Sequence, residues 1–226
     1  MALVLQALDP RVLASHSCWF GGGTAMALRY GEYRESIDVD FLVADRNGYR
    51  ALRQTLGAAA GLAPLVRPGL QLELAREVRA DQYGIRTQVR SGTAQIKFEI
   101  VLEGRIAFDV PGPADVVCGV ATLAPIDLAA EKLLANADRW PDDSVFSRDL
   151  IDLAMQGADR ALLQAACVKA ESAYGGSVRQ ALADAIEALR RRPHRLDECM
   201  RALGISGWSK AQVWSRIRAV QKALAV

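Results

Sequence analysis

The stretch FGGGTAMALRYGEYRESIDVDFLV at residues 20–43 predicts the centre of the fold. Its glycines form a turn, and Thr24 is expected to cap the short helix that follows. Gly31 ends that helix, because glycine readily adopts the left-handed backbone found after helix ends. Residues 37–43 alternate at first and then become wholly apolar, as in a strand that leaves an exposed end and enters a core. The stretch therefore predicts a glycine turn, a helix and a strand with an exposed acidic end.

Each part of this stretch has a chemical use. Gly22 and Gly23 let backbone amides approach a phosphate closely, and the helix N-terminus with the Thr24 hydroxyl favours the same anion. Asp38 and Asp40 leave one face of the strand about 6.5 Å apart along it, close enough to share divalent ions, and Mg²⁺ suits such hard oxygen ligands. A phosphate cradle facing a carboxylate pair is the arrangement that metal-assisted nucleotidyl transfer needs. Taken singly, each motif also fits a plain loop or a solvated strand end.

A third carboxylate is expected on a neighbouring strand, where it can complete a metal shell or accept a proton from the attacking hydroxyl. Glu99 is the candidate, because it lies in the apolar run IKFEI at residues 96–100, where an unpaired charge is costly. Lys97 shares its face if the alternation holds, so a structural ion pair or a solvent-facing edge is the competing interpretation. Asp109, in the next strand candidate, is the reserve choice.

A second charged constellation lies further along the chain, on two predicted helices. Lys132 and Arg139 are seven residues apart and share a helical face, while Asp149 and Asp152 are three apart and also share one. The functional interpretation places Lys132, with Arg139, on a nucleotide triphosphate and uses Asp149 to orient either Lys132 or Arg148. The competing interpretation is an ordinary network of salt bridges between helices.

The pattern of elements changes near residue 125. Helices are expected at residues 2–15 and from Asn47 to about Ala60, and strand candidates follow in LQLELAREV, YGIRTQVR, AQIKFEIVL and GRIAFDV. From Ile126 onwards apolar stripes at helical spacing recur to the C-terminus. We therefore predict an α+β protein with a mixed sheet in a domain at residues 1–124 and a helical bundle in a domain at residues 125–226.

Composition excludes several classes of protein. The net charge of +2, from 28 basic and 26 acidic residues, argues against wholesale binding to nucleic acid or membrane, so an anionic partner must be held locally. No apolar run approaches the roughly 20 residues that span a bilayer, and the N-terminus does not read as a signal peptide. The four cysteines lie singly in apolar stretches, which is typical of buried free thiols and favours a cytoplasmic location: Cys18, Cys118, Cys167 and Cys199.

Three blocks together resemble the AbiEii/AbiGii-type toxin nucleotidyltransferases of bacterial abortive-infection and toxin-antitoxin systems. They are residues 20–43, IKFEI at 96–100, and IDLAAEKLLANADR with SRDLIDLA at 126–154. The resemblance implies a polymerase-beta-like nucleotidyltransferase core followed by a helical domain, dependence on Mg²⁺, and transfer of NMP from an NTP. For family members that act as toxins it also implies an RNA acceptor, in particular tRNA, and a cognate antitoxin protein.

The resemblance also assigns roles to single positions. Thr24 stands where many nucleotidyltransferases have Ser, and the hydroxyl survives. Glu99 stands where Asp is common, and its extra methylene moves the carboxylate. Position by position, the resemblance assigns phosphate contact to Gly23 and Thr24, metal binding to Asp38 and Asp40, the third acidic position to Glu99, and the later site motif to Lys132 and Asp149.

Two other functions fit the same residues. One is a catalytically silent module that binds a nucleotide or a partner protein. The other is a nucleotidyltransferase that modifies a protein side chain or a small molecule such as an aminoglycoside. An acidic pocket beside the paired aspartates favours a cationic antibiotic, and a basic groove favours RNA. Candidate RNA contacts are Arg29, Arg34, Arg50, Arg53, the basic helices around 190–195 and 210–222, and Trp208 and Trp214, which more often pack in a core.

Overall fold

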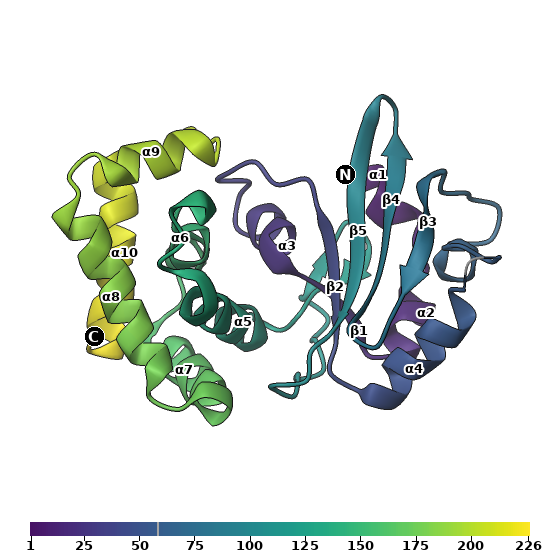
Figure 1. Ribbon diagram of the computed structural model, residues 1–226, viewed down its shortest axis with the longest axis horizontal. Coiled ribbons are helices and arrows are strands. Elements are labelled where there is room, and N and C mark those ends of the chain that lie inside the picture. Colours follow the sequence, from purple (N-terminus) through teal and green to yellow (C-terminus); the bar gives the residue numbers. More distant parts are fainter. Residues whose placement is uncertain (58) are drawn as a thin grey trace. The chain divides into compact units, whose positions relative to one another are not determined.

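The computed structural model describes residues 1–57 and 59–226 (Figure 1). Packing divides the chain into two compact units. The first unit is Met1–Ala25 with Ile37–Ala124, and the second is Met26–Ser36 with Pro125–Val226. The second unit thus takes in a segment that lies, in sequence, between the glycine turn and the paired aspartates.

A five-stranded mixed sheet forms the centre of the first unit, in the order β1-β2-β5-β4-β3. β2 and β5 are parallel, and all other neighbours in this sheet are antiparallel. The mixed sheet that the sequence predicts is therefore confirmed. The strands of this sheet are β1 (Cys18–Gly21), β2 (Val39–Val43), β3 (Leu74–Ala80), β4 (Gly84–Ser91) and β5 (Ala94–Leu102), and a separate two-stranded sheet pairs β6 (Val116–Val117) with β7 (Val120–Ala121).

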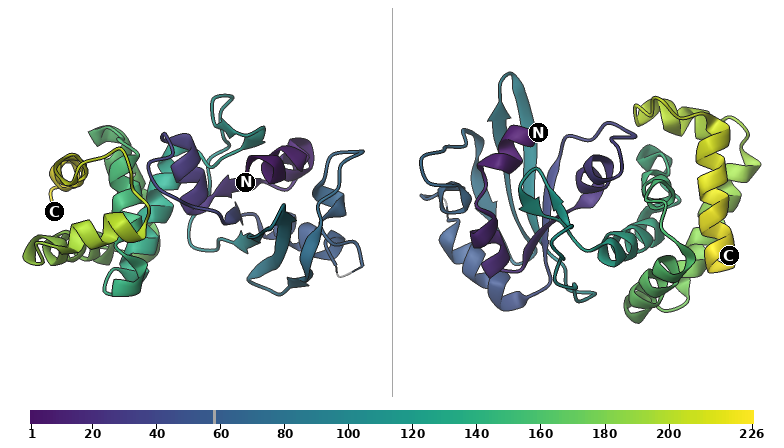
Figure 2. Two further views of the ribbon diagram at one scale, coloured as in Figure 1. Left: turned by 90° about the horizontal axis from the view of Figure 1, so that it is seen from above. Right: turned by 180° about the vertical axis from the view of Figure 1, so that it is seen from behind.

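The two faces of the large sheet differ in chemistry. Phe20, Phe41 and Phe98 are buried on one face, with ring centroids 5.5 and 5.7 Å apart. The opposite face carries the residues that alternate with them, including Asp40 and Glu99. The helices of this unit are α1 (Ala2–Ala7), α2 (Pro10–Ser15) and α4 (Arg46–Thr55), with a short 3₁₀ turn at Ala63–Leu65, and Figures 1 and 2 show α1 and α2 on one side of the sheet. The sheet therefore has a core face and a charged face.

The second unit is helical. Its central helix is α5 (Pro125–Arg139), which packs against α6, α7 and α8. The helical C-terminal half that the sequence predicts is confirmed. The other helices of this half are α6 (Arg148–Met155), α7 (Arg160–Tyr174), α8 (Ser177–Arg191), α9 (Arg195–Ala202) and α10 (Lys210–Leu224).

Two expected helices have different bounds in the structure. The single helix expected at residues 2–15 is two helices, α1 and α2, because Pro10 has no backbone N–H to continue α1. Asp9 instead caps α2, accepting a hydrogen bond of 2.9 Å from the Arg11 amide. The helix expected from Asn47 to about Ala60 is α4 and ends at Thr55; Ala58 lies outside the described residues.

Two further expectations are wrong. α3 (Gly22–Arg29) begins at Gly22, so Thr24 lies inside the first helical turn and is not the cap. The stretch GRIAFDV is not a strand, because Arg105 folds back and its amide donates to Glu103 Oε1 at 2.6 Å, while Val110 at its end is 84% exposed. Asp109 is therefore not on a strand next to Glu99.

The expectation that the cysteines are buried free thiols holds for three of the four. Cys18, Cys167 and Cys199 are buried free thiols, and Cys118 is half-buried. Within residues 1–57 and 59–226, every helix is too short or too polar to cross a membrane.

Candidate active site

The glycine turn lies directly against Asp40. Gly21, the last residue of β1, pairs with Asp40 on β2. Gly22 has a φ of 68°, and a Cβ atom placed on it would lie 2.6 Å from Asp40 Oδ2. Glycine alone fits both the left-handed backbone and this close approach. Because α3 starts here, its first amides and the positive end of its dipole are adjacent to a carboxylate. Amides of this kind bind a phosphate, and a carboxylate beside them suits the metal ion that accompanies it.

Asp38 and Asp40 form the acidic part of this site. Both are half-buried, and Asp38 stands one residue before β2 begins. Mg²⁺ usually takes one or two protein carboxylates and fills its shell with water and substrate phosphates, so this pair suits that ion. Among the residues that the structure describes, no group of three or more His, Cys, Asp or Glu side chains is arranged to hold a metal.

Glu99 lies across from Asp40, because β2 and β5 pair at these two residues. Its two carboxylate oxygens face cations: Oε2 is 2.6 Å from Lys97 Nζ, and Oε1 is 3.2 Å from Arg86 Nε. The expected alternation therefore holds, and the structural ion pair considered as the competing interpretation is present. The metal or base role of Glu99 stays a prediction.

Thr24 is fully buried and has an interaction partner within the protein. Its hydroxyl is therefore not presented to solvent, unlike the amides of a glycine turn. The contact of Thr24 with a phosphate stays a prediction, and Gly22 and Gly23, which are half-buried, are the accessible part of the turn.

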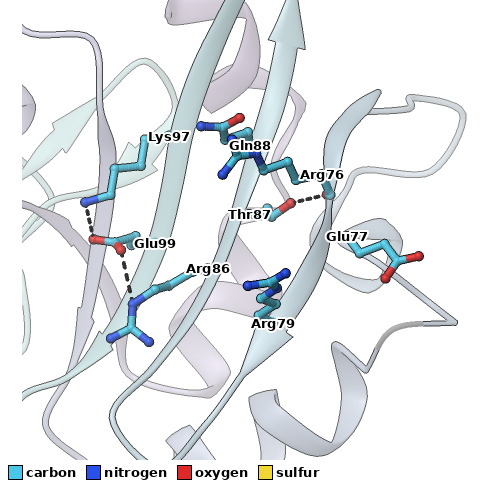
Figure 3. A pocket seen from close by; sticks show the side chains of 8 residues that line it. All are labelled: Arg76, Glu77, Arg79, Arg86, Thr87, Gln88, Lys97 and Glu99. Carbon is cyan, nitrogen blue, oxygen red and sulfur yellow. Dashed lines mark hydrogen bonds and ion pairs between the residues drawn. The ribbon is translucent and has the colours of Figure 1, made fainter.

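A pocket of about 520 Å³ opens on the charged face of the sheet, on β3, β4 and β5 (Figure 3). Glu99 forms one side of it, and the register of the strands aligns Asp40, Glu99, Arg86 and Arg79 in one row. Four cations and two carboxylates make its charge positive. The lining residues are Arg76, Glu77, Arg79, Arg86, Thr87, Gln88, Lys97 and Glu99.

The second constellation is a network inside the second unit. Lys132 Nζ lies 3.1 Å from Asp149 Oδ1 and 2.6 Å from Asp152 Oδ2. Arg139 holds Asp149 with two hydrogen bonds, from Nε at 2.6 Å and from Nη2 at 2.8 Å. Asp149, Asp152 and Lys132 are buried, whereas the Arg139 side chain is 39% exposed. The helix-to-helix ion network is thus present, and triphosphate binding by Lys132 and Arg139 stays a prediction.

The segment before Asp38 in sequence completes this network. Arg34 donates to both oxygens of Asp152, from Nε at 2.6 Å and from Nη2 at 2.9 Å, and the Tyr33 hydroxyl donates to Oδ1 at 2.6 Å. Burial raises the pKa of Asp152, but Lys132 and Arg34 outweigh it and the pKa lies below its usual value. For Asp149, Lys132 and Arg139 likewise outweigh burial and lower the pKa. Both aspartates are therefore ionised at neutral pH.

The sequence interpretation missed Tyr33, Arg34 and Arg86 as parts of these clusters. Arg34 was expected to contact RNA, which is wrong, because its side chain is 3% exposed and paired with Asp152. The alternation in GIRTQVR already indicates that Arg86 lies on the polar face of its strand, but which residue it meets depends on the register.

The other candidate RNA contacts have mixed environments. Arg50 and Arg53 are exposed on α4. The guanidinium of Arg216 lies over the Trp208 ring, 4.6 Å from its centroid, so that ring face is covered. Trp214 is half-buried beside Lys210, which bonds Asp197 at 2.6 Å. Contacts of these residues with RNA stay predictions.

Comparison with solved structures identifies proteins of the same fold. A Helicobacter pylori protein assigned to the nucleotidyltransferases is 18% identical, with 99% of this chain and 93% of that chain covered and a TM-score of 0.52. JHP933 from Helicobacter pylori is 17% identical, with 99% and 90% covered and a TM-score of 0.51. At this identity the similarity shows a shared fold, which is that of a nucleotidyltransferase.

The family follows from the sequence itself. The family model described as nucleotidyl transferase AbiEii toxin, type IV toxin-antitoxin system, matches residues 3–211. The chain therefore belongs to the AbiEii nucleotidyltransferase toxin family. It is a nucleotidyltransferase, and membership implies an NTP substrate and a paired antitoxin. The comparison with curated proteins finds no match.

Proposed function

We propose that this protein transfers NMP from an NTP to an RNA acceptor, with tRNA as the leading candidate, in a reaction that depends on Mg²⁺. The observation that carries the proposal is the contact of the glycine turn with Asp40. The backbone at Gly22 approaches that carboxylate so closely that no side chain fits between them. A phosphate on the turn and a metal ion on the carboxylates then lie next to each other.

In this mechanism Asp38 and Asp40 would hold the metal ion, which would neutralise charge on the transferring phosphoryl group. The amides of Gly22, Gly23 and Thr24 bind the leaving phosphates. Glu99, on the strand next to Asp40, is the candidate third carboxylate. Lys97 and Arg86 form ion pairs with the Glu99 carboxylate, and they must release or share it before it accepts a proton.

The second charged cluster is proposed to bind the triphosphate. Three cations, from Arg34, Lys132 and Arg139, face the two carboxylates of Asp149 and Asp152. Arg139 is the most exposed member of the cluster. We assign Arg139 and Lys132 to phosphate contact, and Asp149 to holding both side chains in place.

The charge of the pocket beside Glu99 favours RNA over a cationic small molecule. Four cations against two carboxylates give that pocket a net positive charge. An aminoglycoside is a polycation and requires a negatively charged pocket. The negatively charged phosphodiester backbone of RNA instead suits this positively charged pocket. The silent-module alternative has no comparable support, because both paired aspartates are intact.

The test is to incubate the protein with Mg²⁺, total bacterial RNA and each of the four α-labelled NTPs in turn, and to detect labelled RNA or protein on a gel. Replacing both Asp38 and Asp40 by Asn should reduce transfer by about 10³-fold or more, because the metal loses its protein ligands. The double variant should stay folded, since both side chains are half-buried at or just before the start of β2, and thermal unfolding checks this.

A matched control separates the paired aspartates from other carboxylates. Asp109, the reserve candidate, is exposed and off the strand, so Asp109→Asn should retain activity. Equal activity in the Asp38/Asp40 double variant would contradict the metal assignment. Label on a protein or on no macromolecule, with NTP still consumed, would contradict the RNA acceptor.

A further inference from the structure

We propose that the pocket on β3, β4 and β5 is the binding site for the phosphodiester backbone of the RNA acceptor, close to its reacting end. The inference rests on the proposed function, because it states where the RNA of that reaction is held. Its main residues are Arg76 and Arg79 on β3 and Arg86 on β4, which line the pocket together (Figure 3).

The first observation is a pair of like charges on adjacent strands. Arg79 on β3 pairs directly with Arg86 on β4, so their side chains leave the same face of the sheet. Like charges directly opposite each other in an antiparallel pair are destabilising, and the carboxylates of Asp81 and Glu99 offset only the charge of Arg86. A phosphate between the two guanidinium groups removes that repulsion and accepts charge-assisted hydrogen bonds from both.

The second observation is that the protein neutralises only part of this charge. Arg86 is shared by Asp81, at 2.9 Å, and Glu99, at 3.2 Å. In the described part of the chain, neither Arg76 nor Arg79 has a carboxylate partner. Both are exposed on the edge strand of the sheet. Guanidinium groups of this kind are suited to phosphate, which they bind with two parallel hydrogen bonds.

The third observation is the position of the pocket along the row of paired residues. The glycine turn, where the leaving phosphates bind in the proposed mechanism, flanks Asp40 on one side, and Glu99, Arg86 and Arg79 follow on the other. In phosphoryl transfer the attacking and leaving oxygens are roughly in line on opposite sides of the phosphorus. The acceptor hydroxyl must therefore arrive from the Glu99 side, where the pocket lies.

The position of the pocket at the edge of the sheet fits a chain rather than a free nucleotide. Its volume of about 520 Å³ is within the range of nucleotide-sized sites. Two of its cations lie on an edge strand, so a strand of RNA can leave the pocket there. With neighbouring strands about 4.8 Å apart, Arg86 and Arg79 are about 10 and 14 Å from Asp40 along the row, which places them at the first phosphodiesters behind the reacting hydroxyl.

The experiment measures RNA binding separately from transfer. Anisotropy of 5′-labelled bulk tRNA is recorded with the full-length protein over a series of KCl concentrations, with Mg²⁺ and without NTP. The test variant is Arg76→Gln with Arg79→Gln, and the matched control is Arg160→Gln with Arg201→Gln, which removes the same charge from exposed positions on α7 and α9. Thermal unfolding checks that both double variants fold.

We expect the pocket variant to bind tRNA about tenfold more weakly at low salt, since two exposed ion pairs are lost. The slope of log K against log salt should shrink by about 1.4 to 1.8, the value for two phosphate contacts, while the control keeps the wild-type slope. In the transfer assay the KM for tRNA should rise in the pocket variant, with the KM for NTP and kcat at saturating tRNA unchanged.

The outcomes separate this inference from the proposed function. Loss of tRNA binding in the pocket variant but no labelled product in any assay supports the pocket and contradicts the proposed transfer to RNA. Wild-type binding in the pocket variant, an equal loss in the control variant, or no tRNA binding by the wild-type protein overturns the pocket. A loss of NTP affinity in the pocket variant also overturns it, because the pocket then serves the nucleotide.

Discussion

In the second unit Asp152 is completely buried and both of its oxygens are held by Arg34, whereas in the first unit Arg79 is exposed and has no carboxylate partner among the described residues. Charged residues therefore serve two purposes in this protein, one in buried ion pairs and one on the exposed surface. A buried ion pair is saturated within the protein, and removing one partner leaves the other charge in a place that water does not reach. An exposed cation without a partner costs the protein little and stays available to a substrate.

The largest expected effect tests the buried side of this comparison. Asp152→Ala should lower the free energy of unfolding by about 3–5 kcal/mol, because Arg34 and Lys132 then remain buried without their shared carboxylate. Urea unfolding measures this loss. The control is Glu187→Gln, which removes a surface partner of Arg190 and Arg191 and should leave the free energy of unfolding nearly unchanged, because solvent screens exposed ion pairs. Similar losses in both variants would remove the distinction between the two kinds of ion pair.

A smaller effect is expected at the glycine turn. Gly22→Ala should lower the free energy of unfolding by about 2–4 kcal/mol, since the left-handed backbone is strained for alanine and the new Cβ meets Asp40 at 2.6 Å. Gly31→Ala is the matched control, because Gly31 has a φ of 90° but no atom within 4 Å of such a Cβ. Calorimetry compares the two variants, and transfer should fail only in Gly22→Ala. Equal behaviour would show that strain alone, and not the approach to Asp40, matters at this turn.

For each carboxylate and each pH unit, the smallest expected effect is the response of the buried network to acid. The folded-state pKa values of Asp149 and Asp152 lie below their usual values, so their contribution to stability is complete above the unfolded pKa of about 3.9 and is lost as the pH falls towards the folded values. Stability should therefore begin to fall below about pH 5, by up to about 1.4 kcal/mol per pH unit for each carboxylate.

Denaturant unfolding at several pH values measures this slope. Asp149→Asn removes one of the two carboxylates and should make the acid slope shallower, although the variant is less stable at neutral pH. An unchanged slope in this variant would assign the acid sensitivity to other carboxylates.

Much of the fold followed from local patterns. The alternation in AQIKFEIVL predicts a strand whose observed bounds are Ala94–Leu102, and the recurring apolar stripes predict the helical half. The interpretation failed where a turn overrode the pattern: Pro10 divides the first helix, and Arg105 folds back on Glu103 in a stretch that alternates like a strand. Local propensity is weak in such segments, so one hydrogen bond or one proline decides the outcome.

In the candidate site, too, some residues were identified from local sequence patterns and others only from the tertiary structure. The glycine turn and the paired aspartates were found from their types and spacing, since backbone amides and carboxylates at strand ends have few other uses together. Arg86 and Arg34 were not found in their observed roles, because each meets its partner across a strand pairing or between distant helices. Arg34 and Asp152 are 118 residues apart in the chain, and no local pattern relates them.

The sequence alone determined the class of chemistry, the strand and helix content and the family, since these depend on residue types at short spacing and on the period of apolar side chains. Only the tertiary structure decided that Gly22 approaches Asp40 to the exclusion of any side chain, that Asp152 joins Arg34 and Lys132 in a buried network, and that Arg79 and Arg86 face one pocket. These features depend on strand register and on packing between elements far apart in the chain, which short-range patterns do not encode.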